Sequence, residues 1–154
     1  MNSIDFISKK FNQLSKKELY QILQLRAEVF VVEQNCPYQD LDELDFNSFH
    51  LCGYLHKELV AYSRVITPGV KYSGTSIGRV IVKSTVRKLG AGKALMNESI
   101  NECRKHWGQD DIFISAQEQL KSFYKDIGFE INSNSYLEDG IPHVEMKLNM
   151  RNLK

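Results

Sequence analysis

The residues best suited to chemistry in this sequence form a short glycine-rich turn, Arg87-Lys88-Leu89-Gly90-Ala91-Gly92. It follows an apolar, β-branched run and precedes a segment with helical spacing. A turn that leads into a helix presents unpaired backbone N–H groups and the positive end of the helix dipole, and both favour a phosphate. Glycine at positions 90 and 92 lets an anion approach the main chain closely. The pattern therefore predicts a phosphate or diphosphate site.

Cationic side chains at Arg87, Lys88 and Lys93 add positive charge around this turn, and a guanidinium can contact a phosphate in a forked geometry. The alternative is an ordinary solvated turn whose glycines only shape the loop. A Walker loop is excluded because it needs glycine where Arg87 stands and Ser or Thr where Ala94 stands. A dinucleotide fingerprint is excluded because it needs a small residue where Leu95 stands.

The elements that must position the turn are a strand before it and a helix after it. The strand is expected from Thr75 to Val82, with Gly78 marking a bulge. The helix is expected because apolar residues recur at helical spacing beyond Gly92. These are Met96, Ile100, Cys103 and Trp107, which we assign to the core.

The remaining pattern predicts a mixed α/β fold. The capping box Ser15 and Glu18 predicts a helix from about Lys16 to Phe30, followed by a loop or short irregular helix over 31–49. Apolar residues around Tyr124 predict a helix over 120–127 that Gly128 ends. Further strands are expected at 4–8, 49–55, 59–66, 111–115, 129–131 and 144–148. The total is roughly six or seven strands and three or four helices.

Composition bounds the class of protein. At 154 residues, 42% hydrophobic and 25% charged, the chain fits one globular domain spanning 1–154. A net charge of +1 disfavours a general nucleic-acid binder, and no stretch has the length and apolar character of a membrane span. The three cysteines form no C-x-x-C pair, so we expect neither a disulfide framework nor a metal site. Reduced thiols of this kind favour a cytoplasmic protein.

Two motifs in the right order resemble the GNAT family of N-acetyltransferases. The turn Arg87-Lys88-Leu89-Gly90-Ala91-Gly92 is similar to the acetyl-CoA signature Q/R-x-x-G-x-G/A of that family. The segment Phe123-Tyr124-Lys125-Asp126-Ile127-Gly128-Phe129 is similar to its F-Y-x-x-x-G-F pattern. Residues 25–34, 36–38 and 139–146 resemble the ElaA-like branch, so the resemblance covers nearly the whole chain. It implies a mostly antiparallel sheet of six to seven strands flanked by three to four helices.

The resemblance also implies a site for acetyl-CoA (coenzyme A). Backbone groups of Ile81 and Val82 would hold the pantetheine, and the turn would hold the diphosphate. The diphosphate-binding residues implied are Arg87, Lys88, Leu89, Gly90, Ala91, Gly92 and Lys93. Tyr124 would also line the cofactor site.

Tyr124 is our candidate general acid, since a phenol can protonate a leaving thiolate. Periodicity alone would equally allow a core role for Tyr124. Glu33 is our first candidate for the base that deprotonates the amine, with His50 and His143 as alternatives; each could instead be a surface or structural residue.

Other charged residues are harder to assign. The acidic residues Asp42, Glu43 and Asp45 could attract a cationic amine or could simply be solvated. Arg26, among apolar helix neighbours, fits a buried structural charge, and we assign it no chemistry.

The activity expected from the resemblance is acetyl transfer to a primary amine on a small molecule or peptide, by direct attack on the thioester. A non-catalytic acyl-CoA-binding or sensing domain is the alternative, and a protein that binds ATP or NAD at the glycine turn is a third hypothesis. The sequence leaves the oligomeric state open. A homodimer is one option, because strands in folds of this kind often pair between subunits.

Overall fold

A computed structural model describes residues 3–152 of the chain and shows an eight-stranded sheet with three α-helices. The strands are β1 (Asp5–Lys10), β2 (Phe49–Leu55), β3 (Glu58–Ile66), β4 (Thr75–Val82), β5 (Ile112–Gln117), β6 (Glu130–Ile131), β7 (Tyr136–Glu138) and β8 (Ile141–Leu148). The helices are α1 (Lys16–Arg26), α2 (Ala91–Trp107) and α3 (Lys121–Ile127). A π-helical segment (Ala27–Glu33) continues α1, and a 3₁₀ segment (Ser84–Leu89) precedes α2.

The strand order is β1-β2-β3-β4-β5-β8-β6. Strand β7 pairs with the first residues of β8, 141–143. Every pairing is antiparallel except the one between β4 and β5, which is parallel. The parallel pair requires a crossover, and α2 supplies it. The glycine turn therefore lies at the end of β4, where the crossover begins.

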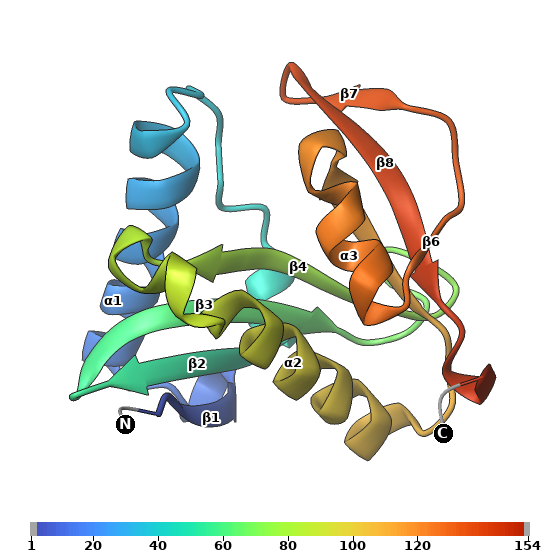
Figure 1. Cartoon of the computed structure of the whole chain (residues 1–154). Coiled ribbons are helices and arrows are strands. Elements are labelled where there is room, and N and C mark those ends of the chain that lie inside the picture. Colours follow the sequence, from blue (N-terminus) through green and yellow to red (C-terminus); the bar gives the residue numbers. More distant parts are fainter. Residues whose placement is uncertain (1–2, 153–154) are drawn as a thin grey trace.

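The β4–β5 junction is short. Only Thr75 with Ile112 and Ser76 with Phe113 are paired, although both strands continue beyond these residues. Residues 77–82 of β4 and residues 114–117 of β5 are not paired with each other, and we call this separation the split. In Figure 1, β4 and β8 run apart from the junction. A sheet that splits here leaves backbone groups of two strands free to bind a ligand.

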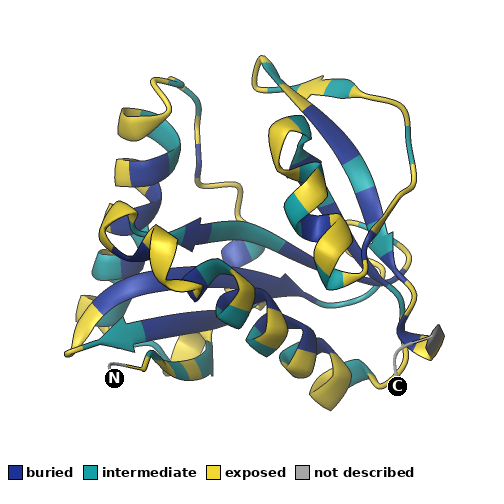
Figure 2. Cartoon of the chain, viewed as in Figure 1, coloured by how far each residue is buried: buried dark blue, intermediate teal, exposed yellow. Residues whose placement is uncertain are grey.

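Helices cover both faces of the sheet. On one face, Ile22, Leu25 and Val29 form a buried cluster with Tyr62 and Ile81. On the other face α2 and α3 cover the sheet, and both stand in front of it in Figure 1. The strands are largely buried, whereas the outward sides of these helices are exposed (Figure 2). This amphipathic pattern explains why residues at helical spacing beyond Gly92 became core.

The predicted mixed, mostly antiparallel fold is confirmed, and two details differ. The sheet has eight strands rather than six or seven, because β7 was not predicted. Its three residues lie between polar turn residues, too few to show alternation. The first helix keeps α-helical geometry only to Arg26 and then becomes π-helical, a rare form that is frequent at functional sites.

A bulge distorts β4 beside the split. The register against β3 shifts between Tyr62 and Arg64, and the extra residue on β4 falls next to Gly78, as its position in the sequence suggested. Arg79 has a φ of 50°, in the left-handed region that non-glycine residues rarely occupy. A residue in this conformation must be held by its surroundings.

Candidate active site

The glycine turn has the geometry of an anion site. Gly90 has a φ of 76°, a conformation that favours glycine, and α2 begins at the next residue, Ala91. No side chain among residues 3–152 caps the start of α2, and the first amides of a helix have no partner within it. A Cβ built at Gly90 would meet nothing within 4 Å. The turn therefore opens outward.

The cationic side chains expected around the turn are exposed on its surface. The side chains of Arg87, Lys88 and Lys93 are exposed, as is Leu89. Arg87 is fixed by a hydrogen bond of 2.8 Å from its Nε to the carbonyl oxygen of Val82, the last residue of β4. The guanidinium is thus held between the strand end and the helix start, where a diphosphate would need it.

Glu33, the candidate base, lies at the end of the π-helical segment and forms an ion pair with Arg87. Both side chains are about 40% exposed, at 39% and 40%. The structure therefore brings together two residues that the sequence placed in different roles. In this arrangement the carboxylate is positioned to orient Arg87.

The glycine turn, the segment that contains Phe123 and the end of β4 meet at Gly92. A Cβ built there would lie 3.4 Å from the ring of Phe123 and 3.9 Å from Val82. Gly92 is the second residue of α2, Phe123 belongs to α3, and Val82 ends β4. The helix start, α3 and the strand end therefore pack around Gly92, where a Cβ would make ordinary van der Waals contacts.

Tyr124 follows Phe123 and is almost completely buried, with 7% of its surface exposed. It shares a buried cluster with Ile114 and Ala116 of β5 and makes an edge-on contact with Phe129. Among the described residues its hydroxyl has no hydrogen-bond partner, and burial raises the pKa of Tyr124 to about 12. The phenol therefore keeps its proton at neutral pH, as a proton donor must.

The end of β4 carries the backbone groups that we expected to hold the pantetheine. The amide of Lys83 donates to the carbonyl oxygen of Val60 on β3 at 2.7 Å. Because the backbone groups of successive strand residues point to opposite edges, those of Val82 face the split. The side chain of Ile81 is buried on the α1 side, with 1% exposed.

Of the alternative bases, His50 is fully occupied by protein. Its Nδ1 lies 2.7 Å from the Tyr62 hydroxyl, and its Nε2 lies 2.9 Å from the Asp45 carbonyl oxygen. Burial lowers the pKa of His50, against a smaller opposing effect from Asp45. His143 lies instead on β8, with Nδ1 2.7 Å from the Ile141 carbonyl oxygen and Nε2 3.4 Å from a carboxylate oxygen of Glu138.

The acidic segment before β2 is bound by arginines rather than open to an amine. Arg26 pairs with Asp40 at 2.8 Å and Asp45 at 2.7 Å, and it is fully buried, as its apolar neighbours suggested. Arg64 pairs with Asp42 at 2.7 Å and Asp45 at 3.0 Å. Asp45 is therefore buried and neither solvated nor free for a substrate, whereas Asp42 is exposed but paired with Arg64.

A third arginine completes this network. Arg79, the bulge residue, donates from Nε to Asp40 at 2.7 Å. Burial opposes ionisation of Asp42, but hydrogen bonds and charges from Arg64 and Arg79 outweigh it and lower the pKa of Asp42 to about 2. The network ties α1, β3 and β4 to one segment. Arg64 is two residues from Tyr62 on β3, so both side chains lie on the same buried face. This spacing was the signal in the sequence that the face contains a buried charge.

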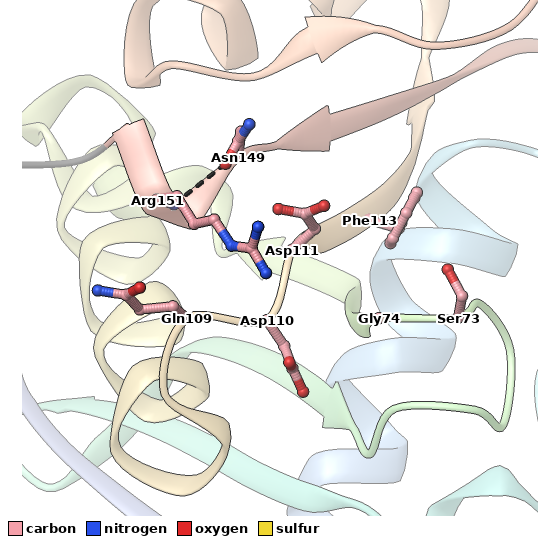
Figure 3. A pocket seen from close by; sticks show the side chains of 8 residues that line it. All are labelled: Ser73, Gly74, Gln109, Asp110, Asp111, Phe113, Asn149 and Arg151. Carbon is pink, nitrogen blue, oxygen red and sulfur yellow. Dashed lines mark hydrogen bonds between the residues drawn. The ribbon is translucent and has the colours of Figure 1, made fainter.

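An open pocket lies at the other end of the β4–β5 junction (Figure 3). It is lined by Ser73, Gly74, Gln109, Asp110, Asp111, Phe113, Asn149 and Arg151. These residues lie where β4 and β5 begin, whereas the glycine turn follows the end of β4. A Cβ at Gly74 would lie 2.2 Å from the Asp111 carbonyl oxygen, so glycine there allows the junction to close. The pocket is separate from the candidate site.

The fold is that of the GNAT acyltransferase family. The GNAT acetyltransferase domain profile matches residues 11–150, and the chain belongs to this family. A relative is the protein ElaA of Escherichia coli strain K12, 42% identical over 137 residues, which cover 88% of this chain and 90% of ElaA.

Two solved structures are closely similar. The crystal structure of E. coli ElaA superposes with a TM-score of 0.89 at 39% identity, covering 95% of this chain and 99% of that one. An acyl-CoA N-acyltransferase from Pseudomonas aeruginosa superposes with a TM-score of 0.90 at 40% identity, with the same coverage of 95% and 99%.

The described residues contain neither a helix that could span a membrane nor a cluster that could hold a metal ion. None of their helices combines the length and apolar character that crossing a membrane requires. Within residues 3–152, no group of three or more His, Cys, Asp or Glu side chains is placed to hold a metal ion.

Proposed function

We propose that this protein is an acetyl-CoA-dependent N-acetyltransferase that transfers the acetyl group to a primary amine by direct attack on the thioester. The observation that carries the proposal is the split between β4 and β5, with an open glycine turn at the end of β4 and the buried phenol of Tyr124 beside β5. The similar P. aeruginosa protein is an acyl-CoA N-acyltransferase, which supports acyl-CoA as the donor.

The residues present fit coenzyme A. The turn combines a helix start without a side-chain cap, a glycine with open space at its Cβ position, and exposed cations. Residues 87–93 would hold the diphosphate, and backbone groups of Val82, with Ile81 beside it, would hold the pantetheine. Acetyl-CoA would supply a thioester carbonyl that is open to attack by an amine.

The chain's own residues would divide the chemistry between them. The main chain at the end of β4 would orient the acyl group and polarise its carbonyl. Tyr124 would donate its proton to the leaving thiolate, a step for which its hydroxyl is free. The role of Glu33 as base stays a prediction, since the structure places it against Arg87. The free cysteines agree with action in the reducing cytoplasm.

Amine-dependent release of free thiol tests the proposal. Acetyl-CoA is incubated with the protein and a panel of primary amines that includes polyamines, amino sugars and lysine-containing peptides. We expect thiol release that requires both the protein and an amine. Tight coenzyme A binding without turnover on any amine would instead support a non-catalytic acyl-CoA-binding domain.

A thermal shift distinguishes coenzyme A from ATP and NAD as the ligand of this site. A ligand at 100 times its Kd stabilises the folded state by about 2.7 kcal/mol, so coenzyme A should raise the melting temperature clearly. ATP and NAD serve as matched controls, because both carry phosphates and an adenine. A shift with ATP or NAD and none with coenzyme A would refute the assignment.

A further inference from the structure

The sheet carries a second polar cluster on the face opposite α3. In an antiparallel pair, residues directly across from each other share a face. Ser115 of β5 pairs with Glu145 of β8, and His143 of β8 pairs with Tyr136 of β7. The alternate residues of β5 and β8 belong to the core with α3. Polar side chains from three strands are therefore gathered on one face.

Glu138 is the centre of this cluster. Ser115 donates from Oγ to Glu138 Oε1 at 3.1 Å, and Oγ also lies 2.5 Å from the Tyr136 hydroxyl. The other carboxylate oxygen, Oε2, lies 3.4 Å from His143 Nε2. Among residues 3–152 no lysine or arginine forms an ion pair with Glu138, in contrast to Asp40, Asp42 and Asp45. Its side chain is 41% exposed and retains acceptor capacity for a ligand.

His143 lies beneath this carboxylate. Its side chain is only 8% exposed, and its ring stacks on Tyr136. Because a carbonyl oxygen can only accept, the contact with Ile141 requires the proton on Nδ1. The neutral ring then presents an unprotonated Nε2 toward Glu138. A proton accepted on Nε2 would point toward the Glu138 carboxylate, while Nδ1–H keeps its contact with the Ile141 carbonyl oxygen.

The cluster adjoins the split. Ser115 belongs to the part of β5 that has no partner in β4. Gln117, two residues on, lies 3.4 Å from Gln34, just after the π-helical segment. Lys71 also lies near: its pKa is lowered by desolvation, and the charge of Glu138 opposes this shift. Glu138 is therefore linked through Ser115 to the part of β5 that borders the split.

We propose that Glu138 binds the ammonium group of the acceptor, a cationic primary amine, and that His143 takes up the proton that the ammonium loses. This inference rests on the proposed acetyltransferase function. The ammonium gives one proton to Glu138, which passes it to His143 Nε2. The neutral nitrogen then forms the C–N bond, the C–S bond breaks, and the thiolate takes the proton of Tyr124. The second proton of the nitrogen returns Tyr124 to its phenol form through solvent. His143 then gives its proton to solvent, so that one proton is released per amide.

The test uses the acceptor from the amine panel that the wild-type protein acetylates fastest. Its Kd is measured by calorimetry in protein saturated with coenzyme A, which cannot react. A hydrogen bond to a charged group contributes enough that Glu138→Gln should weaken this Kd at least about tenfold. Glu130→Gln, which removes an exposed carboxylate from the neighbouring β6, is the matched control and should leave it unchanged.

The proton step is tested by turnover as a function of pH. His143→Gln should lower kcat about 100-fold near pH 7, where the amine is protonated. The deficit should shrink as pH rises toward the acceptor's own pKa of about 10, because neutral amine then needs no base. The Kd of acetyl-CoA should be unchanged in both variants, which shows that the fold and the donor site are intact.

The outcomes separate the two proposals. If the wild-type protein binds acetyl-CoA and acetylates no amine, the proposed function fails and this inference fails with it. If the wild-type protein is active but Glu138→Gln has the acceptor affinity of Glu130→Gln, the inference alone is overturned. It is likewise overturned if Glu33→Gln, and not His143→Gln, produces the deficit that high pH relieves.

Discussion

The guanidinium of Arg79 holds the carboxylate of Asp40, with Nε 2.7 Å from Oδ1 and Nη2 2.8 Å from the Asp40 carbonyl oxygen. The second carboxylate oxygen accepts from Arg26 at 2.8 Å. Since Arg79 is the bulge residue of β4, this pair fastens the segment before β2 to the strand that borders the split. The bulge is thus held by charge as well as by the sheet.

Two substitutions at position 79 separate the ion pair from the backbone strain. Arg79→Ala removes the partner of a buried carboxylate and should lower the free energy of unfolding by roughly 2–4 kcal/mol. Arg79→Gly removes the same guanidinium but accepts positive φ, and should be about 1 kcal/mol more stable than the alanine variant. Urea unfolding measures both. Equal stability of the two variants would show that the bulge is unstrained.

Gly90→Val should weaken coenzyme A binding at least about tenfold, because a side chain there blocks approach to the helix start. Positive φ also makes valine strained, at a cost of roughly 1–2 kcal/mol in stability. Gly69→Val is the matched control, since Gly69 has a φ of 84° and open space but lies in a different turn. Calorimetry should show the loss of affinity in Gly90→Val alone. Equal affinity in the two variants would place the diphosphate elsewhere.

Tyr124→Phe should lower kcat about 100-fold while leaving coenzyme A affinity unchanged. The hydroxyl has no partner among the described residues, so the free energy of unfolding should change by less than about 0.5 kcal/mol. Thiol release and thermal unfolding together check this. Full activity in the phenylalanine variant would assign Tyr124 to the core only.

Acid should weaken the arginine network in a defined pH range. The pKa of Asp42 is about 2 in the folded chain, against about 3.9 when unfolded. As pH falls from about 4 to about 2, the unfolded chain takes up a proton first, so the free energy of unfolding decreases. Asp42→Asn removes this titration and should show a shallower slope over that range in urea titrations. Parallel slopes would show that the pKa is not lowered.

Local patterns in the sequence predicted the parts of the site that are contiguous. The capping box of Ser15 and Glu18 is formed, and the glycine turn does begin a helix after β4. Pairings between distant residues were not predictable in this way. Arg79 and Asp40 are 39 residues apart, and nothing in either neighbourhood specifies the other. Glu138 was missed because β7 is too short to show alternation.

Thr75 with Ile112 and Ser76 with Phe113 are the only paired residues of β4 and β5 in the described part of the chain. Strands β1 to β4 and strands β5 to β8 are thus two hydrogen-bonded blocks that meet along a narrow hinge line. A ligand laid along the split would bridge both blocks at once. Deuterium uptake should then slow in β4 and in β5 together when coenzyme A binds, although the two strands barely touch.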